Sequence, residues 1–230
     1  LQIDDSGGQT LDQTPHGHFL LAVLQACAAQ LAPVALLALL KHPLCQPWPD
    51  CESYQDAVAT LENLALRGPR PAPGIAALQA RLTDAAQAGA ETASAQKLLQ
   101  TIEELFPPLL KLCADPSPQK IAALAVAHLA LAERLAGDTL WRGADGESSA
   151  LFFADFLQQS RDMPALPPED YGLVLRQLLR QVTVRPAYGA HPRLQILGQL
   201  EARLVAADQI ILGGLNEGVW PPDPGHDPWM

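Results

Sequence analysis

The sequence has 230 residues, of which 48% are apolar and 17% are charged, and its formal net charge is −10. No apolar run approaches the roughly 20 residues that cross a bilayer, and acids stand at positions 4 and 5 where a signal peptide is basic, so we expect a soluble, cytoplasmic protein without a membrane partner. The acidic balance argues against autonomous, tight binding of nucleic acid, because domains that neutralise phosphates are usually basic.

The first forty residues predict a short strand and two helices. Gln2-Ile3 has strand character, and Thr14-Pro15 is a helix start, with threonine as the N-cap and proline at the first helical position. One apolar face then follows at helical spacing: Phe19, Leu20, Val23, Leu24, Cys27 and Leu31. Pro33 opens a second helix that is apolar nearly all round from Val34 to Leu40, so we expect it to be buried.

Proline, glycine and capping residues divide the middle of the chain into further helices. Asp50 caps a third helix, which ends at Gly68-Pro69, and two more are expected over about residues 75–89 and 93–106. Ser117-Pro118 repeats the cap-plus-proline start for a sixth helix. A short apolar helix at Leu151–Leu157 and a longer one from Pro167-Pro168 complete the series.

The cysteines and histidines predict no metal site. Cys45 and Cys51 lie in a proline-rich loop near His42, but three ligands at this spacing match no zinc pattern and a fourth is missing. A reduced thiol pair is expected instead. The remaining residues of these types are interpreted as apolar cysteines on helices (Cys27, Cys113), a hydrogen-bonded core histidine (His128) and loop histidines (His16, His18, His226).

Two short apolar runs near the C-terminus, Leu194–Leu197 and Gln209–Leu212, predict strands. Each is too short for a helix, and both read as buried strands of a parallel sheet. The eleven residues between them suit a short crossover. We expect the two strands to be adjacent, with Gln2-Ile3 in or beside the same sheet. The predicted fold class is therefore mainly α with a small parallel β-sheet.

The C-terminal stretch also carries a family resemblance. LQILGQLEARLVAADQIILGGLNEGVWPPDP, from Leu194 to Pro224, resembles the returning strands of the second motor domain of UvrD-like, superfamily 1 helicases, and more closely the AddB subunits of AddAB helicase–nucleases. The opening LQIDDSGGQTLDQTPHGHFL and LLALLKHPL at Leu36–Leu44 are similar to AddB too. The resemblance implies a 2A-like motor domain in residues 1–45 and 183–230, and a helical 2B-like insertion in residues 46–182.

Glu217 and Gly218 are the nucleotide-binding candidates that the resemblance implies. In UvrD-like motors the acid of this turn lies near the nucleotide ribose, and a carboxylate can accept hydrogen bonds from the ribose hydroxyls. The alternative is an acid that braces a glycine turn. Active motors carry a histidine, a lysine and a glycine before the Leu-Glu of the neighbouring motif. The corresponding span here, GQLEAR at 198–203, has no lysine, which favours the alternative and argues against ATP hydrolysis.

Clustered arginines are the candidates for DNA binding. We call them the basic strip: Arg176, Arg180, Arg185 and Arg193, followed by Arg203. No acid lies between residues 171 and 200, and the planar guanidinium suits phosphate contacts. The other interpretation is that Arg176 and Arg180 complement the dipole of a helix C-terminus. Both interpretations remain open.

The resemblance implies a role in processing double-stranded DNA ends for recombinational repair, beside an AddA-like helicase–nuclease partner. Because the sequence begins without methionine, we expect a piece of a longer protein, whose other parts would carry ATP and iron–sulfur cluster sites. No catalytic residue, metal or cofactor is assigned to this piece, which we expect to catalyse nothing alone. Two alternatives stay open: a fragment of an active UvrD-like DNA helicase, and a helical protein-interaction domain without a nucleic-acid role, which a buried basic strip would favour.

Overall fold

The computed structural model describes residues 4–5, 7–185, 194–198, 201–214 and 216. Most of these residues are helical, as the sequence predicted. The α-helices are α1 (Pro15–Ala28), α2 (Pro33–Leu40), α3 (Cys51–Leu61), α4 (Ile75–Gln87), α5 (Ala93–Leu105), α6 (Pro107–Ala114), α7 (Ile121–Ala136), α8 (Gly143–Gln159) and α9 (Pro168–Leu179). Shorter turns are the 3-10 helices η1 (Leu11–Gln13), η3 (Gly137–Trp141) and η4 (Glu201–Leu204), and the π-helical turn η2 (Glu62–Leu66). Among the described residues, no helix combines the length and apolarity that a membrane crossing requires.

Local capping residues set the starts of two helices as predicted. The Thr14 hydroxyl accepts a hydrogen bond from the Gly17 amide at the start of α1, and the Asp50 carboxylate accepts one from the Glu52 amide at the start of α3. The predicted start at Ser117-Pro118 is wrong, because α7 begins only at Ile121. The reason is tertiary: Gln119 forms an antiparallel bridge with Leu166, which keeps this segment extended.

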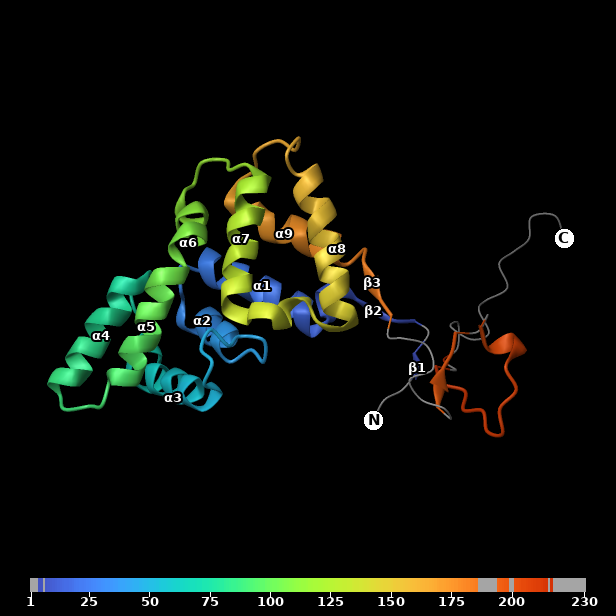
Figure 1. The fold of residues 1–230 in the computed structure, drawn as a ribbon, viewed down its shortest axis with the longest axis horizontal. Helices are drawn as coiled ribbons and strands as arrows, with labels where there is room; N and C mark the ends of the chain where they lie inside the picture. Colours follow the sequence, from blue (N-terminus) through green and yellow to red (C-terminus); the bar gives the residue numbers. More distant parts are fainter. Residues whose placement is uncertain (1–3, 6, 186–193, 199–200, 215, 217–230) are drawn as a thin grey trace.

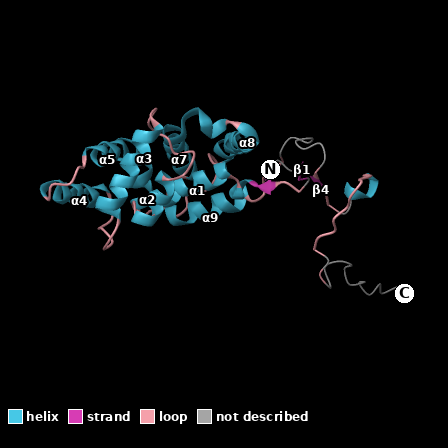
Figure 2. Ribbon diagram, turned by 90° about the horizontal axis from the view of Figure 1, so that it is seen from below, coloured by secondary structure: helices cyan, strands magenta, loops and turns pink. Residues whose placement is uncertain are grey.

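Residues 11–182, here called the helical body, share one hydrophobic core. α1 lies at its centre and packs against α2, α6, α7, α8 and α9, while α3, α4 and α5 form a group at one end (Figures 1 and 2). The buried residues of this core come from every α-helix of the body. Helix–helix packing of this kind buries one stripe of each helix and leaves the opposite face in water.

Two features of the core differ from expectation. α2 buries Leu36, Leu39 and Leu40 but leaves Val34 84% exposed, because only one of its faces meets α1 and η2. The core also continues across residue 45, where the resemblance placed a domain boundary, since α1 and α2 share it with helices of the 46–182 segment. That boundary therefore stays a prediction without a matching break in the packing.

Two short strands join where the chain enters and leaves the helical body. β2 (Gln9–Thr10) and β3 (Thr183–Val184) form an antiparallel pair, with Gln9 opposite Val184, and we call this pair the neck. The Leu11 amide extends the ladder by donating to the Val182 carbonyl at 2.8 Å. The body therefore begins and ends at one place (Figure 1).

The C-terminal strands depart from the predicted parallel sheet. β4 is limited to Gln195–Ile196 and pairs in parallel with β1 (Asp4–Asp5), on the other side of the neck from the helices (Figure 1). Gln209–Leu212 is not a strand, and Ile210, Ile211 and Leu212 are 69%, 84% and 62% exposed. Parallel strands need cover on both faces, and the described part of the chain offers this run none. Gln2-Ile3 lies outside the described residues.

Candidate nucleic-acid interface

An ion pair between η1 and α9 closes the base of the helical body. Arg180 Nε donates to Asp12 Oδ2 at 3.0 Å, and the Thr10 hydroxyl donates to Asp12 Oδ1 at 2.7 Å. The Asp12 side chain is only 6% exposed, whereas that of Arg180 is 53% exposed. The carboxylate thus sits under the neck, while part of the guanidinium still faces water.

Burial alone would raise the pKa of Asp12. Hydrogen bonds from Thr10 and Arg180, together with the positive charges of Arg180 and Arg176, outweigh the burial and hold this pKa below its usual value. Asp12 is therefore ionised at neutral pH and neutralises part of the basic strip. Sequence reasoning missed this partner, because Asp12 stands 168 residues before Arg180 and carries no local signal of the contact.

Three of the five predicted arginines gather beside the neck. Arg176 lies one helical turn before Arg180 on α9, close enough to affect the Asp12 carboxylate. Arg185 follows β3, and its Cγ lies 2.9 Å from the position that a Cβ on Gly8 would take. All three arginines are exposed, and among the described residues no side-chain hydrogen bond or ion pair is formed by the guanidinium of Arg176 or Arg185.

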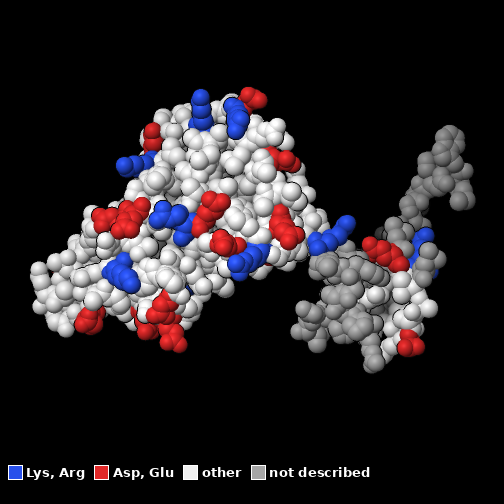
Figure 3. Space-filling view, in the orientation of Figure 1, with Lys and Arg blue, Asp and Glu red and all other residues white. Residues whose placement is uncertain are grey.

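The remaining predicted site residues do not join this group. Arg203 lies on η4, exposed and beyond the neck. Arg193, Glu217 and Gly218 lie outside the described residues, so the nucleotide-binding prediction stays a prediction. Over the face of the helical body drawn in Figure 3, lysines and arginines alternate with acids.

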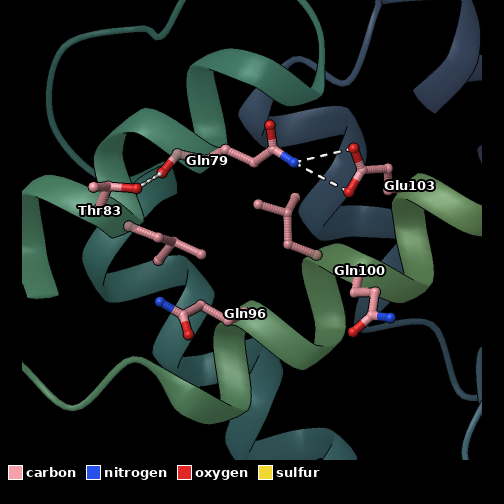
Figure 4. Close-up of a pocket in the computed structure, with 7 residues that line it drawn as sticks. Gln79, Thr83, Gln96, Gln100 and Glu103 are labelled. Atoms are coloured by element: carbon pink, nitrogen blue, oxygen red, sulfur yellow. Dashed lines mark hydrogen bonds between the residues drawn. The ribbon is translucent and has the colours of Figure 1, made fainter.

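Another polar cluster of the helical body, between α4 and α5, forms hydrogen bonds among its own residues. A hollow of about 170 Å³ between α4 and α5 is lined mainly by amides and one acid (Figure 4). The Gln79 amide donates to both carboxylate oxygens of Glu103 at 3.1 Å, and the Thr83 hydroxyl donates to the Gln79 carbonyl. Within the described ranges, no three metal-ligating side chains are placed to hold an ion.

The two buried histidines also have structural partners. His128 is fully buried, with Nε2 2.8 Å from the Leu20 carbonyl oxygen and Nδ1 3.3 Å from the Tyr171 hydroxyl, which confirms the predicted core histidine. His16 and His18 were expected in loops, but both lie in α1, where His16 Nδ1 is 2.8 Å from Asp145 Oδ2 of α8. That expectation was wrong because the predicted start at Thr14-Pro15 already placed both residues inside a helix.

No family model, curated protein or solved structure matches this sequence. The resemblance to UvrD-like helicases and AddB therefore receives no support from these comparisons.

Proposed function

We propose that the chain is part of an AddB-like subunit that processes DNA double-strand breaks. The observation that carries the proposal is the closed neck: the helical body leaves and rejoins the rest of the chain through paired strands. Beyond the neck, β1 and β4, from before and after the body, are parallel neighbours. We infer from this arrangement a helical insertion into a motor-like domain.

In this proposal the base of the helical body contacts DNA phosphates. Arg176, Arg180 and Arg185 are exposed beside the neck, and phosphate contacts position a protein on DNA without reading its sequence. Binding by this piece alone is weak, because Asp12 neutralises Arg180 and the chain carries a net charge of −10. An AddA-like helicase–nuclease partner and other parts of the parent protein supply the affinity, the ATP hydrolysis and any iron–sulfur cluster.

The protein-interaction alternative is distinguished by the same arginines. A buried basic strip would have favoured that alternative, but the three arginines beside the neck face solvent. For the alternative of an active helicase, no geometric feature of the described residues adds support. The DNA-binding proposal is therefore the one that we test.

The test is a titration of fluorescent single-stranded DNA at low salt. We compare the wild type with Arg176→Gln/Arg180→Gln/Arg185→Gln. The wild type should bind weakly, with a log–log salt slope of about −2 from three contacts at about 0.7 each. The triple variant should lose most of this binding, and binding by the wild type should not depend on DNA sequence.

A matched control removes three charges from exposed positions elsewhere on the helical body: Arg70→Gln/Lys120→Gln/Arg161→Gln. This control should bind DNA nearly as well as the wild type. Equal losses in the two triple variants would mean that only total charge matters. No binding by the wild type at low salt would contradict the proposed DNA interface and would favour the alternative of a protein-interaction domain.

A further inference from the structure

Two cysteines line one cavity beside α3. The cavity has a volume of about 360 Å³, and its walls include His42, Cys45, Cys51 and Tyr54. Cys45 lies in the loop between α2 and α3, and Cys51 is the first residue of α3. Both cysteines are therefore lining residues of one cavity, although residues 46–50 separate them in the sequence.

The Cys45 thiol is held inside the cavity wall. It is 1% exposed, and its Sγ lies 3.2 Å from the Tyr54 hydroxyl, which in turn donates to the Leu40 carbonyl at 2.9 Å. Burial raises the pKa of Cys45 to about 12, although the Tyr54 hydrogen bond opposes the effect. Cys45 is therefore protonated at neutral pH and protected from direct attack by a dissolved oxidant.

Cys51 has the opposite surroundings. It is partly exposed in the first turn of α3, and its Sγ accepts a hydrogen bond from Gln46 Nε2 at 2.8 Å. Solvent access, a donor to the sulfur and a second cysteine nearby are the features of an oxidisable thiol with a resolving partner. The two cysteines thus differ in the way that a two-step oxidation requires.

We propose that Cys51 and Cys45 form a reversible oxidation site for hydrogen peroxide. The Cys51 sulfur attacks one peroxide oxygen, the O–O bond breaks, and Cys51 becomes a sulfenic acid while the other oxygen leaves as water. The Cys45 sulfur then attacks the Cys51 sulfur, the S–O bond breaks, and the hydroxyl leaves as a second water with the Cys45 proton. Two thiols are oxidised to a disulfide, peroxide is reduced, and an excess of a small thiol reverses the reaction.

The other two cysteines are poorly placed for this chemistry. Cys27 is fully buried, and burial raises the pKa of Cys113 to about 11. The disulfide replaces the contacts of Cys45 with Tyr54 and of Cys51 with Gln46.

The experiment treats the reduced 230-residue chain with hydrogen peroxide, blocks free thiols after unfolding, and maps the cysteines by mass spectrometry. The wild type should yield a peptide pair joined through Cys45 and Cys51 and lighter by two hydrogen atoms. Cys45→Ser should stop at a Cys51 sulfenic acid that dimedone traps. Cys51→Ser should give neither product.

Two further variants separate the proposed steps. Gln46→Ala removes the closer of the two amide donors to Cys51 Sγ and should slow the appearance of the sulfenic acid. Tyr54→Phe removes the hydrogen bond that opposes the effect of burial on the Cys45 pKa, so it should slow disulfide formation. Circular dichroism verifies that each variant folds. If a variant does not fold, the cysteine assignment in the peroxide-treated wild type decides the proposal. Free Cys45 and Cys51 after peroxide treatment, or Cys51 joined only between two molecules, would overturn it.

Discussion

At the scale of single residues, His128 shows how a polar side chain can stand in the core. Its ring lies edge-on to Phe153, with the centroids 6.2 Å apart, and both ring nitrogens have partners. The Leu20 carbonyl can only accept, so Nε2 carries the proton and Nδ1 accepts from the Tyr171 hydroxyl. Burial disfavours the charged, doubly protonated ring and lowers the pKa of His128 to about 4, although the hydrogen bond to the Leu20 carbonyl opposes the effect.

This pKa predicts a loss of stability on acidification. Between pH 6.5 and 4 the unfolded chain binds a proton at His128 that the folded chain does not, so the free energy of unfolding falls through this window. A shift from 6.5 to about 4 corresponds to about 3 kcal/mol, with no contribution above pH 7 and no further loss below pH 4. Urea unfolding at several pH values measures this slope. His128→Gln should be less stable at neutral pH and should lack this part of the pH dependence. An unchanged slope in the variant would assign the acid sensitivity to other groups.

The core position of His128 could be predicted because the helical spacing of its apolar neighbours is local information. The ion pair of Asp12 with Arg180 and the contact of His16 with Asp145 could not, because each joins residues that are more than a hundred positions apart. Sequence patterns indicate which side chains are buried more readily than which polar side chains meet. Three arginines of the basic strip lie together beside the neck, but the sequence did not reveal Asp12 as a neutralising partner.

At the scale of elements, the start of α1 packs unusually closely on η1. A Cβ on Gly17 would stand 1.8 Å from the Leu11 carbonyl oxygen, which is backbone and cannot move aside. Gly17→Ala should therefore destabilise the protein by about 3 kcal/mol or more, as strong overpacking does.

Gly172→Ala in α9 is the matched control, since its Cβ would meet only Leu24 Cδ2 at an ordinary 3.5 Å. The control should be neutral or more stable by up to about 1 kcal/mol, because alanine favours helix. Thermal denaturation of both variants decides, and similar melting temperatures would contradict the packing argument.

Helices and strands were not equally predictable. The starts of α1 and α3 follow from residues within one turn, so Thr14 and Asp50 could be identified as caps. A strand depends on a partner from elsewhere in the chain, and the apolar run Gln209–Leu212 carried no information about one. The predicted start of α7 was wrong for the same reason, because a bridge between Gln119 and Leu166 keeps the residues before Ile121 out of the helix.

At the scale of the whole molecule, the hydrophobic core formed by the described residues lies in the helical body and its neck. Every described member of the core lies between Leu11 and Val184. The described residues beyond β3 include exposed apolar side chains, such as Ile196 and Ile211. The stability of the described fold therefore comes from residues 9–185, although the basic strip continues past them.

An excised chain of residues 9–185 should consequently fold alone. It keeps both strands of the neck, the Asp12–Arg180 ion pair and the whole described core, so we expect one cooperative unfolding transition within a few degrees of the 230-residue chain.

A shorter chain of residues 15–182 tests the role of the neck. It lacks β2, β3 and η1, so it exposes the core that Leu11 and Val184 cover, and it should melt at a clearly lower temperature. Circular dichroism and calorimetry compare the three chains at equal concentration. An unfolded 9–185 chain would mean that the segments beyond the neck stabilise the body, and equal melting of the two shorter chains would mean that the neck does not close it.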